Sequence, residues 1–349
     1  MQYLPSKKKL ILMILIITTT FTLSNILYLA WGQIIPIVST RGHFDLSSGI
    51  LLFGHTETDY RPLNIPGLQV GNCPPEIVVY VHGWNADEES ATRQLNVVMN
   101  SLESRDIDYS HPVIGFSWDS DTSESLNLWD LWDFWDLSGL GELRDTLEAW
   151  DNGKDIATQN GLKLGKFVLD FKTACEHTKV RLLSHSLGAR VILNALGGLF
   201  NEPELALWNA ADRNYKVESV HLLGAAVNPE DISITRGFGI PIREEVNQFH
   251  NKFSLQDDVL EQNYRNAESP NIALGEEGAQ NMASGLGNKY HELDVSREIS
   301  RDSDGDGRNN YLHLGDDHMG YAGVVNRNNG ELTSNGAMDL VVEDWRNNQ

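Results

Sequence analysis

The chain has 349 residues, of which 41% are hydrophobic and nine are tryptophan. This composition excludes a disordered protein and is typical of a chain that buries one large core or two small ones. Its 49 acidic and 27 basic residues give a formal net charge of −22, which argues against nucleic acid as a partner, because binding to phosphates needs clustered lysine and arginine.

The first 32 residues have the pattern of an export segment. Three lysines at positions 7–9 precede an uncharged run, residues 10–31, in which leucine and isoleucine dominate. A small residue at Gly32 offers a cleavage site, so residues 1–32 fit a signal peptide. The run is also long enough to span a bilayer as an uncleaved signal anchor. Both alternatives place the remainder outside the cytoplasm, either secreted or held at a membrane by its N-terminal segment.

Residues 33–75 alternate short apolar runs with glycine, proline and aspartate, which predicts strands of an antiparallel sheet edge. Continuous apolar runs follow and alternate with helical patterns; such runs suit strands buried on both faces of a parallel sheet. The predicted strands are residues 76–84, 112–118, 178–185, 217–227 and 247–255. The predicted helices are residues 91–104, 154–174, 187–200 and 335–346. This alternation indicates βαβ units, so the sequence predicts one α/β domain over residues 33–349.

The stretch RLLSHSLGAR, residues 181–190, runs from a predicted strand into a predicted helix through small residues. That is the setting of a nucleophile elbow, in which a G-x-S-x-G sequence places serine at the tip of a sharp turn. Ser186 fits the central position, with Ser184 in place of the first glycine and Gly188 as the second. Ser184 does not fit the centre itself, because Leu182 stands two residues before it. The alternative is that Ser186 only caps the following helix.

In order along the chain, VVYVHGW, FSW, LLSHSLGAR, LLGAAV and FSLQDDVL resemble the α/β-hydrolase fold family, serine esterases and lipases in particular. The resemblance covers roughly residues 76–325. It implies a mostly parallel, doubly wound sheet with a cap or lid insertion. It also implies a catalytic triad in the chain order serine, acid, histidine.

The resemblance directs the search for the other two members of the triad. It selects Asp257 as the acid, because FSLQDDVL follows the fifth predicted strand and resembles the acid turn of these hydrolases. It selects His318 as the histidine, because DDHMGYAG resembles the final segment of the family, a histidine followed closely by glycine and an aromatic residue. The alternatives are Asp258 and Asp231 for the acid, and His291 and His313 for the histidine.

The family also implies an oxyanion hole, which is built from backbone N–H groups. One N–H belongs to Leu187, the residue after the nucleophile. The other belongs to Trp84 or, alternatively, to Asn85. His82 and Gly83 shape this loop, since glycine permits a close backbone approach.

The chain has two cysteines, Cys73 and Cys175, each a few residues before a predicted strand. In the sheet order of the family those two strands are neighbours, so both thiols lie at the non-catalytic end of the sheet. In an exported chain this predicts a disulfide. The alternative is a pair of buried free thiols.

An insertion of about residues 119–150 contains the segment NLWDLWDFWDLSGLGEL. Trp129, Trp132 and Trp135 recur every third residue, each followed by aspartate. One interpretation is an apolar lid that contacts lipid or covers the site where the acyl chain of the substrate binds. The alternative is a cap helix packed permanently on the body.

An acidic loop of about residues 300–317 contains DSDGDGRNN. Asp302, Asp304 and Asp306, followed by glycine at position six, match the start of a calcium loop. Position twelve is a histidine instead of a bidentate glutamate, so the ion would need other ligands from the loop. Those ligands are Asn310, Asp316 or Asp317. A structural calcium ion and an acidic turn without an ion therefore stay open as alternatives.

Taken together, these features predict a serine hydrolase that cleaves carboxylic esters, of small molecules or lipids, through an acyl-enzyme and without a required cofactor. A thioesterase or amidase with the same triad is the nearest alternative. A non-catalytic hydrolase fold that serves as a surface binding module is a second. A calcium-binding adhesion domain is a third.

Overall fold

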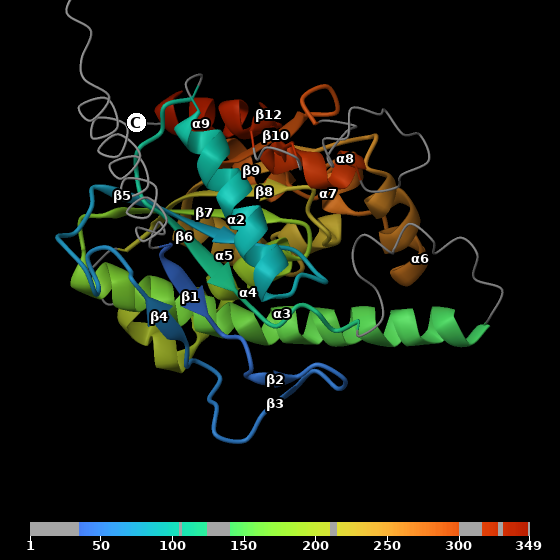
Figure 1. The fold of residues 1–349 in the computed structure, drawn as a ribbon, viewed down its shortest axis with the longest axis horizontal. Helices are drawn as coiled ribbons and strands as arrows, with labels where there is room; N and C mark the ends of the chain where they lie inside the picture. Colours follow the sequence, from blue (N-terminus) through green and yellow to red (C-terminus); the bar gives the residue numbers. More distant parts are fainter. Residues whose placement is uncertain are drawn as a thin grey trace, which may run out of the picture. The chain divides into compact units, whose positions relative to one another are not determined.

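The central feature of the computed structural model is an eight-stranded sheet with the order β10-β9-β8-β7-β5-β6-β1-β4 (Figure 1). Its neighbouring strands pair in parallel, except β1 with β4. The structure describes residues 35–104, 107–123, 140–209, 215–299, 316–326 and 331–347. The strands are β1 Ile37–Ser39, β4 Arg61–Leu63, β5 Glu76–Val81, β6 Val113–Ser117, β7 Lys179–His185, β8 Val217–Leu223, β9 Val246–Phe253 and β10 Tyr290–Asp294.

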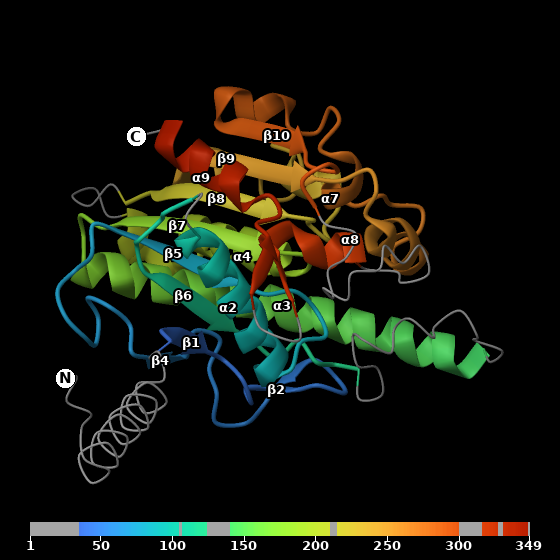
Figure 2. The same ribbon diagram turned by 45° about the horizontal axis from the view of Figure 1, so that its top comes forward.

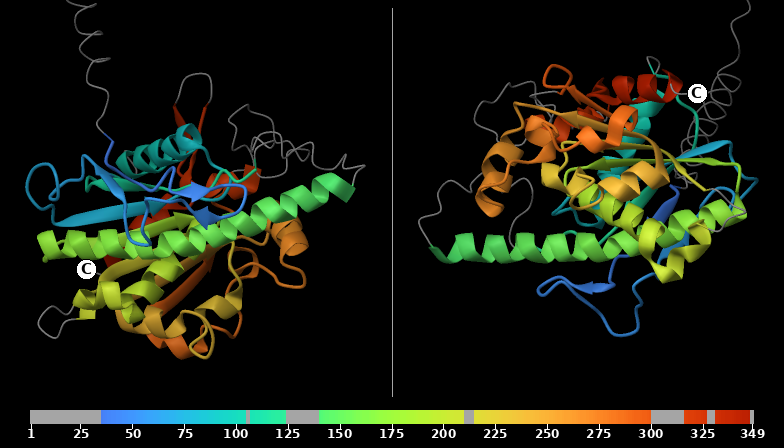
Figure 3. Two further views of the ribbon diagram at one scale, coloured as in Figure 1. Left: turned by 90° about the horizontal axis from the view of Figure 1, so that it is seen from below. Right: turned by 180° about the vertical axis from the view of Figure 1, so that it is seen from behind.

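Helices cover both faces of this sheet. Figure 2 shows α2 (Glu88–Glu103) and α9 (Met338–Asn347) on one face. The left view of Figure 3 shows α3 (Leu140–Ala174) and α4 (Gly188–Asn201) on the other. The shorter elements are β2 Phe44–Asp45, β3 Ile50–Leu51, η2 Pro203–Asn209, η3 Pro229–Ile232, α5 Gly239–Glu245, η4 Leu260–Tyr264, α6 Arg265–Ala267, α7 Leu274–Glu277, η5 Ser284–Lys289, α8 Asp316–Met319, η6 Gly320–Ala322, β11 Val324–Val325 and β12 Leu332–Ser334.

The burial of the central strands explains their sequences. All six residues of β5 and all five of β6 are buried, as expected where helices cover both faces of a parallel sheet. The amphipathic α2 turns Leu95 and Val98 inward. The predicted α/β class, with a mostly parallel and doubly wound sheet, is therefore confirmed.

Several of the sequence predictions differ from the structure. Helix α3 begins at Leu140, well before the predicted residue 154. Strand β8 ends at Leu223, because Gly224 has a φ of 54° that breaks the extended backbone. The segment 33–75 is only partly antiparallel, since β1 pairs with β4 in that sense but with β6 in parallel. Strand β10 was missed because it is a largely exposed, polar edge strand.

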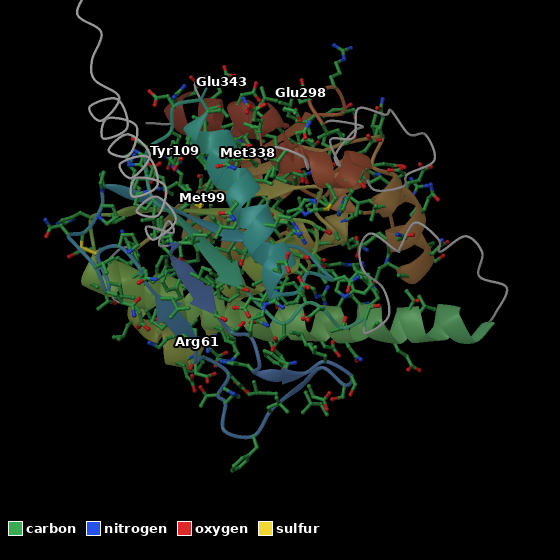
Figure 4. All side chains as sticks on the ribbon, viewed as in Figure 1. Arg61, Met99, Tyr109, Glu298, Met338 and Glu343 are labelled. Carbon is green, nitrogen blue, oxygen red and sulfur yellow. A yellow bond between two sulfur atoms is a disulfide. The ribbon has the colours of Figure 1, made fainter. Side chains whose placement is uncertain are left out.

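The predicted disulfide is present. Cys73 and Cys175 are bonded, with their Cα atoms 5.5 Å apart and their positions separated by 102 in sequence. The two residues precede β5 and β7, which are neighbours in the sheet. The bond therefore joins the amino ends of two central strands (Figure 4).

Helix α9 is held to the sheet by a charged cluster around Asp344. The Asp344 Oδ2 lies 2.7 Å from the Lys252 Nζ, 3.1 Å from the His250 Nδ1 and 3.3 Å from the His221 Nε2. Burial alone would raise the pKa of Asp344, but its hydrogen bonds to His221, His250 and Lys252 hold that pKa below its usual range. The Trp345 Nε1 donates to the His221 Nδ1 at 3.2 Å, so the other nitrogen of that neutral ring donates to the carboxylate.

Several sequence predictions lie outside the described residues. They are the export segment of residues 1–32, the tryptophan segment with Trp129, Trp132 and Trp135, and the calcium loop with Asp302, Asp304 and Asp306. Within the part of the chain that the structure describes, no helix has the length and apolarity needed to cross a bilayer. Residues Pro36–Gln349 form one compact unit.

Replacing both cysteines, with Cys73→Ser and Cys175→Ser, is expected to lower the free energy of unfolding by about 3–4 kcal/mol, because the unfolded chain loses a long covalent loop. Urea unfolding followed by circular dichroism measures this. The wild-type protein under reducing conditions is the matched control and should unfold like the double variant. An unchanged free energy of unfolding would contradict the prediction.

The variant Asp344→Asn is expected to lower the free energy of unfolding by about 2–3 kcal/mol at neutral pH, since it leaves the buried Lys252 ammonium without its carboxylate. The pKa of Asp344 is lower in the folded protein than in the unfolded chain. The difference in free energy of unfolding between the variant and the wild type should therefore have its full size above a pH of about 4 and shrink as the pH falls further. The control is Glu343→Gln, on the same helix and exposed (Figure 4). Equal stabilities of the two variants at neutral pH would argue against the cluster.

Candidate active site

Ser186 lies at a strained turn between β7 and α4. Its φ is 53°, a left-handed value that is uncommon for a residue other than glycine. The backbone N–H of Ser186 donates to the Leu223 carbonyl at 3.0 Å, and the Ser186 carbonyl accepts from the Ala226 N–H at 3.2 Å. These bonds tie the turn to the segment that ends β8. The strain is therefore held by the neighbouring strand, as expected of a nucleophile elbow.

The turn is possible because small residues surround it. A Cβ on Gly188 would lie 2.5 Å from the Val81 carbonyl oxygen, and a Cβ on Gly83 would lie 2.9 Å from the Ser186 Cβ. Both positions exclude any larger residue unless the backbone moves. Ser184, which replaces the first glycine of the elbow pattern, is fully buried. The substitution of serine for glycine at that position is thus accommodated in the interior.

Asp257 and His318 are brought together from distant parts of the chain. The Asp257 Oδ2 accepts a hydrogen bond from the His318 Nδ1 at 2.8 Å, and both side chains are buried. The same oxygen accepts from the Tyr321 hydroxyl at 3.1 Å, while the Oδ1 accepts from the Leu260 N–H at 3.0 Å. Since the carboxylate fixes the proton on Nδ1, the Nε2 of His318 keeps a lone pair and can act as a base.

Tyr321 was not predicted as a site residue. Burial, followed by the charge of Asp257, raises the pKa of Tyr321 well above its usual value, so the phenol stays protonated and serves as a donor to the carboxylate. The only signal in the sequence was the aromatic residue in DDHMGYAG, three positions after His318.

The alternative acids and histidines lie elsewhere or make other contacts. The Asp231 carboxylate accepts from the Asn228 N–H at 3.1 Å as part of the cap of η3. Asp258 is adjacent to Asp257, but it is Asp257 that contacts His318. His291 is exposed on β10, where its ring bonds the Gln248 side chain at 2.9 Å. His313 lies outside the described residues.

His185, the residue before Ser186, also contacts the segment that carries His318. Its Nε2–H donates to the backbone carbonyl of His318 at 2.7 Å, and the two rings have centroids 4.6 Å apart. Burial, followed by the charge of His318, lowers the pKa of His185 to about 3. The ring is therefore neutral near pH 7 and holds the histidine loop against the serine turn. Within the described part of the chain, no hydrogen bond joins the Ser186 Oγ to the His318 ring.

The loop after β5 lies next to the serine turn. The Asn85 N–H donates to the Ser120 carbonyl at 2.8 Å, so this N–H is already engaged within the fold. The indole Nε1 of Trp84 donates to the Thr122 hydroxyl at 2.8 Å, and its ring packs edge-on against Trp150. Of the two alternatives for the second oxyanion donor, Asn85 thus has its N–H bonded to a carbonyl of the fold, and Trp84 is the one carried into the proposal below.

Two groups of side chains have the composition of metal sites. They are His43, His55 and Asp59, and His221, His250 and Asp344. In each group a lysine ammonium bonds the carboxylate, Lys163 at 2.6 Å in the first and Lys252 at 2.7 Å in the second. The two imidazole rings of each group are also stacked, with centroids 3.9 Å and 4.2 Å apart. Parallel rings cannot both direct in-plane lone pairs at one ion, so both groups are charge-paired clusters.

The chain is similar in structure to several esterases. The catalytic core domain of acetyl xylan esterase from Trichoderma reesei is 11% identical, with 62% of this chain and 99% of that chain covered and a TM-score of 0.30. Esterase B from Lactobacillus rhamnosis is 12% identical, with 67% of each chain covered and a TM-score of 0.34. A cutinase-like protein from Cryptococcus sp. is 14% identical, covering 71% of this chain and 88% of that chain, with a TM-score of 0.31. No curated protein sequence matches the chain.

A sequence family described as alpha/beta hydrolases of unknown function (DUF900) matches residues 72–238. This segment runs from just before β5 to the end of the loop before α5 and includes Ser186. The match agrees with the parallel strands β5, β6, β7 and β8 and with the strained serine turn after β7, which lie inside it. The chain therefore has an α/β-hydrolase fold, and its residues 72–238 match this family of α/β hydrolases.

Proposed function

We propose that the protein is a serine hydrolase that cleaves carboxylic esters, with Ser186, Asp257 and His318 as its catalytic triad. The observation that supports this most directly is the joint placement of the three residues. Ser186 lies at a strained turn at the carboxyl end of β7, while Asp257 follows β9 and bonds His318 at 2.8 Å. The carboxyl ends of parallel strands are where α/β folds assemble their sites.

In the proposed reaction, the His318 Nε2 takes the proton of the Ser186 hydroxyl as its Oγ attacks the ester carbonyl. The tetrahedral intermediate then collapses, and the His318 ring gives that proton to the leaving alcohol. Water, activated by the same ring, hydrolyses the acyl-enzyme and releases the acid. Asp257 orients His318 and stabilises the imidazolium, and Tyr321 holds the carboxylate in place. All of these steps use side chains of the protein, so the proposed reaction needs no cofactor.

The oxyanion of the tetrahedral intermediate is proposed to accept hydrogen bonds from the backbone N–H groups of Leu187 and Trp84. Leu187 is the N-cap residue of α4, so its N–H lies at the positive end of a helix dipole. Gly83, which precedes Trp84, packs against the Ser186 side chain. The tetrahedral oxygen would therefore be held between these two donors.

The substrate is proposed to be a small-molecule or lipid ester, and the protein is proposed to act outside the cytoplasm. The Cys73–Cys175 disulfide is in keeping with an oxidising compartment. The N-terminal sequence is proposed to direct export, either as a signal peptide or as an anchor. The tryptophan segment is proposed to cover the acyl site, and a thioester or amide substrate would use the same triad.

Ser186→Ala is expected to abolish ester cleavage, with a loss of about 10,000-fold or more in kcat, while leaving the fold intact. Labelling of the wild-type protein with a fluorophosphonate, followed by peptide mapping, should place the adduct on Ser186. Chain-length series of p-nitrophenyl esters and a matched thioester measure the substrate class. A wild-type protein that is folded but forms no adduct would instead favour a non-catalytic binding module.

Asp257→Asn is expected to lower kcat by about 1,000- to 10,000-fold, because the amide no longer holds the proton on the correct nitrogen of His318. His318→Ala should be similarly inactive. Asp258→Asn and Asp231→Asn are the matched controls, and each should retain activity within about threefold, since neither carboxylate bonds the His318 ring. A larger loss in Asp258→Asn or Asp231→Asn than in Asp257→Asn would reassign the acid.

A further inference from the structure

We propose that Arg41 is a positioning residue for the oxyanion hole and acts through His82 on the peptide between Gly83 and Trp84. This inference rests on the proposed hydrolase function. Arg41 lies before the segment 72–238 that the family match covers, so nothing in that match assigns it a role.

Arg41 follows β1 and reaches across to the loop after β5. Its side chain is only 11% exposed. The Nη2 donates to the Ala86 carbonyl at 2.7 Å and lies 3.3 Å from the His82 Nε2. The Nε donates to the Ser117 hydroxyl at 2.9 Å, and the Nη1 donates to the Asp121 carboxylate at 3.0 Å. The guanidinium is thus fixed by acceptors on both sides and touches the loop at its first and last residues.

These contacts determine which nitrogen of His82 carries a proton. Guanidinium groups can only donate, so the His82 Nε2 must be the acceptor. The Trp118 backbone N–H donates to the same nitrogen at 3.1 Å, which requires the same tautomer. The His82 Nδ1 therefore carries the proton and donates it to the Gly83 carbonyl at 2.9 Å. Burial and the charge of Arg41 hold the pKa of His82 well below its usual value, so this ring stays neutral.

The bond from His82 sets the direction of the next peptide. In a trans peptide the C=O and the following N–H point in opposite directions, and the Gly83–Trp84 peptide is trans. Because the Gly83 carbonyl points toward the His82 ring, the Trp84 N–H points away from it. Gly83 itself packs against the Ser186 Cβ. The tautomer of His82 therefore turns the proposed oxyanion donor away from the His82 ring, and in the proposal this N–H faces the substrate carbonyl bound at Ser186.

The backbone around Arg41 is anchored independently of the loop. The Asp119 carboxylate accepts hydrogen bonds from the N–H groups of Gly42, His43 and Phe44, at 2.9, 3.0 and 3.1 Å. Asp119 follows β6, which is the strand between β1 and β5. The backbone of residues 42–44, directly after Arg41, is thus bonded to the central sheet. This contact helps to place Arg41 beside His82.

The experiment compares Arg41→Gln with Arg61→Gln, using the full-length protein and a p-nitrophenyl ester. Arg61 is an exposed arginine on the neighbouring strand β4 (Figure 4), so the control removes the same charge without touching the loop. Arg41→Gln should lower kcat by about tenfold, less than the loss of a direct oxyanion donor, and should leave KM within about twofold. Its rate of fluorophosphonate labelling should fall in parallel. Arg41→Lys keeps the positive charge and a donor but lacks the planar guanidinium with its several donors. Its loss in kcat should therefore be smaller than that of Arg41→Gln.

A double-variant comparison tests whether Arg41 acts through His82. If it does, the kcat of the Arg41→Gln, His82→Gln pair should equal that of His82→Gln alone, whereas multiplied losses would overturn the route through His82. If Arg41→Gln folds poorly, Asp121→Asn serves instead, because it removes the carboxylate that bonds the Arg41 Nη1. This variant should give a smaller loss in kcat than Arg41→Gln. Unchanged kcat per folded molecule in both Arg41→Gln and Asp121→Asn would overturn the proposal. An active Ser186→Ala would instead overturn the hydrolase function itself, so the two failures are distinguishable.

Discussion

The left-handed backbone of Ser186 is the constraint on which the rest of the site depends. A serine with a φ of 53° is unfavourable unless its surroundings hold it there. The hydrogen bonds from β8 hold the peptide, and Gly188 lets α4 approach the Val81 carbonyl. The φ of Ser186 thus explains several neighbouring features. They are Gly188, the buried Ser184 and the close packing of α4 on the sheet.

The parallel sheet gathers the remaining groups around that turn. Asp257, the loop of His82–Ala86 and the serine turn each follow the carboxyl end of a neighbouring or nearby strand. His318 reaches the same edge from α8 and is held there from two sides, by the Asp257 carboxylate and by His185. The site therefore combines segments from the first and last parts of the domain. Its order depends on packing across the whole sheet, and not on one local motif.

The sequence predicted the parts of this arrangement that depend on local patterns. The buried strands β5, β6, β7 and β9 were evident as apolar runs, and the serine turn as small residues between a strand and a helix. The selection of Asp257 and His318 depended on a family resemblance, because spacing along the chain does not report which loops meet. Tyr321 and His185 could not be identified, since their roles arise from contacts with residues 64 and 133 positions away.

The errors have a similar physical origin. Strand β10 is a polar edge strand that gains its structure from pairing with β9, so its own sequence carries a weak signal. Arg41 lies in a segment that looked like a simple antiparallel edge. The strand before it, β1, pairs in parallel with β6, and the Arg41 guanidinium lies beside His82. The pattern of apolar residues along a strand does not indicate which distant strand it pairs with.

The disulfide has a consequence for proteolysis. It encloses the segment between Cys73 and Cys175, which contains β5, α2, β6 and α3, together with the loop of His82–Ala86. Ser186, Asp257 and His318 all lie outside it. A single cut anywhere within the enclosed segment would leave the two fragments covalently joined, so both would migrate together until a reductant separated them. A protease-nicked form would thus keep the loop of His82–Ala86 on the same molecule as Ser186, Asp257 and His318.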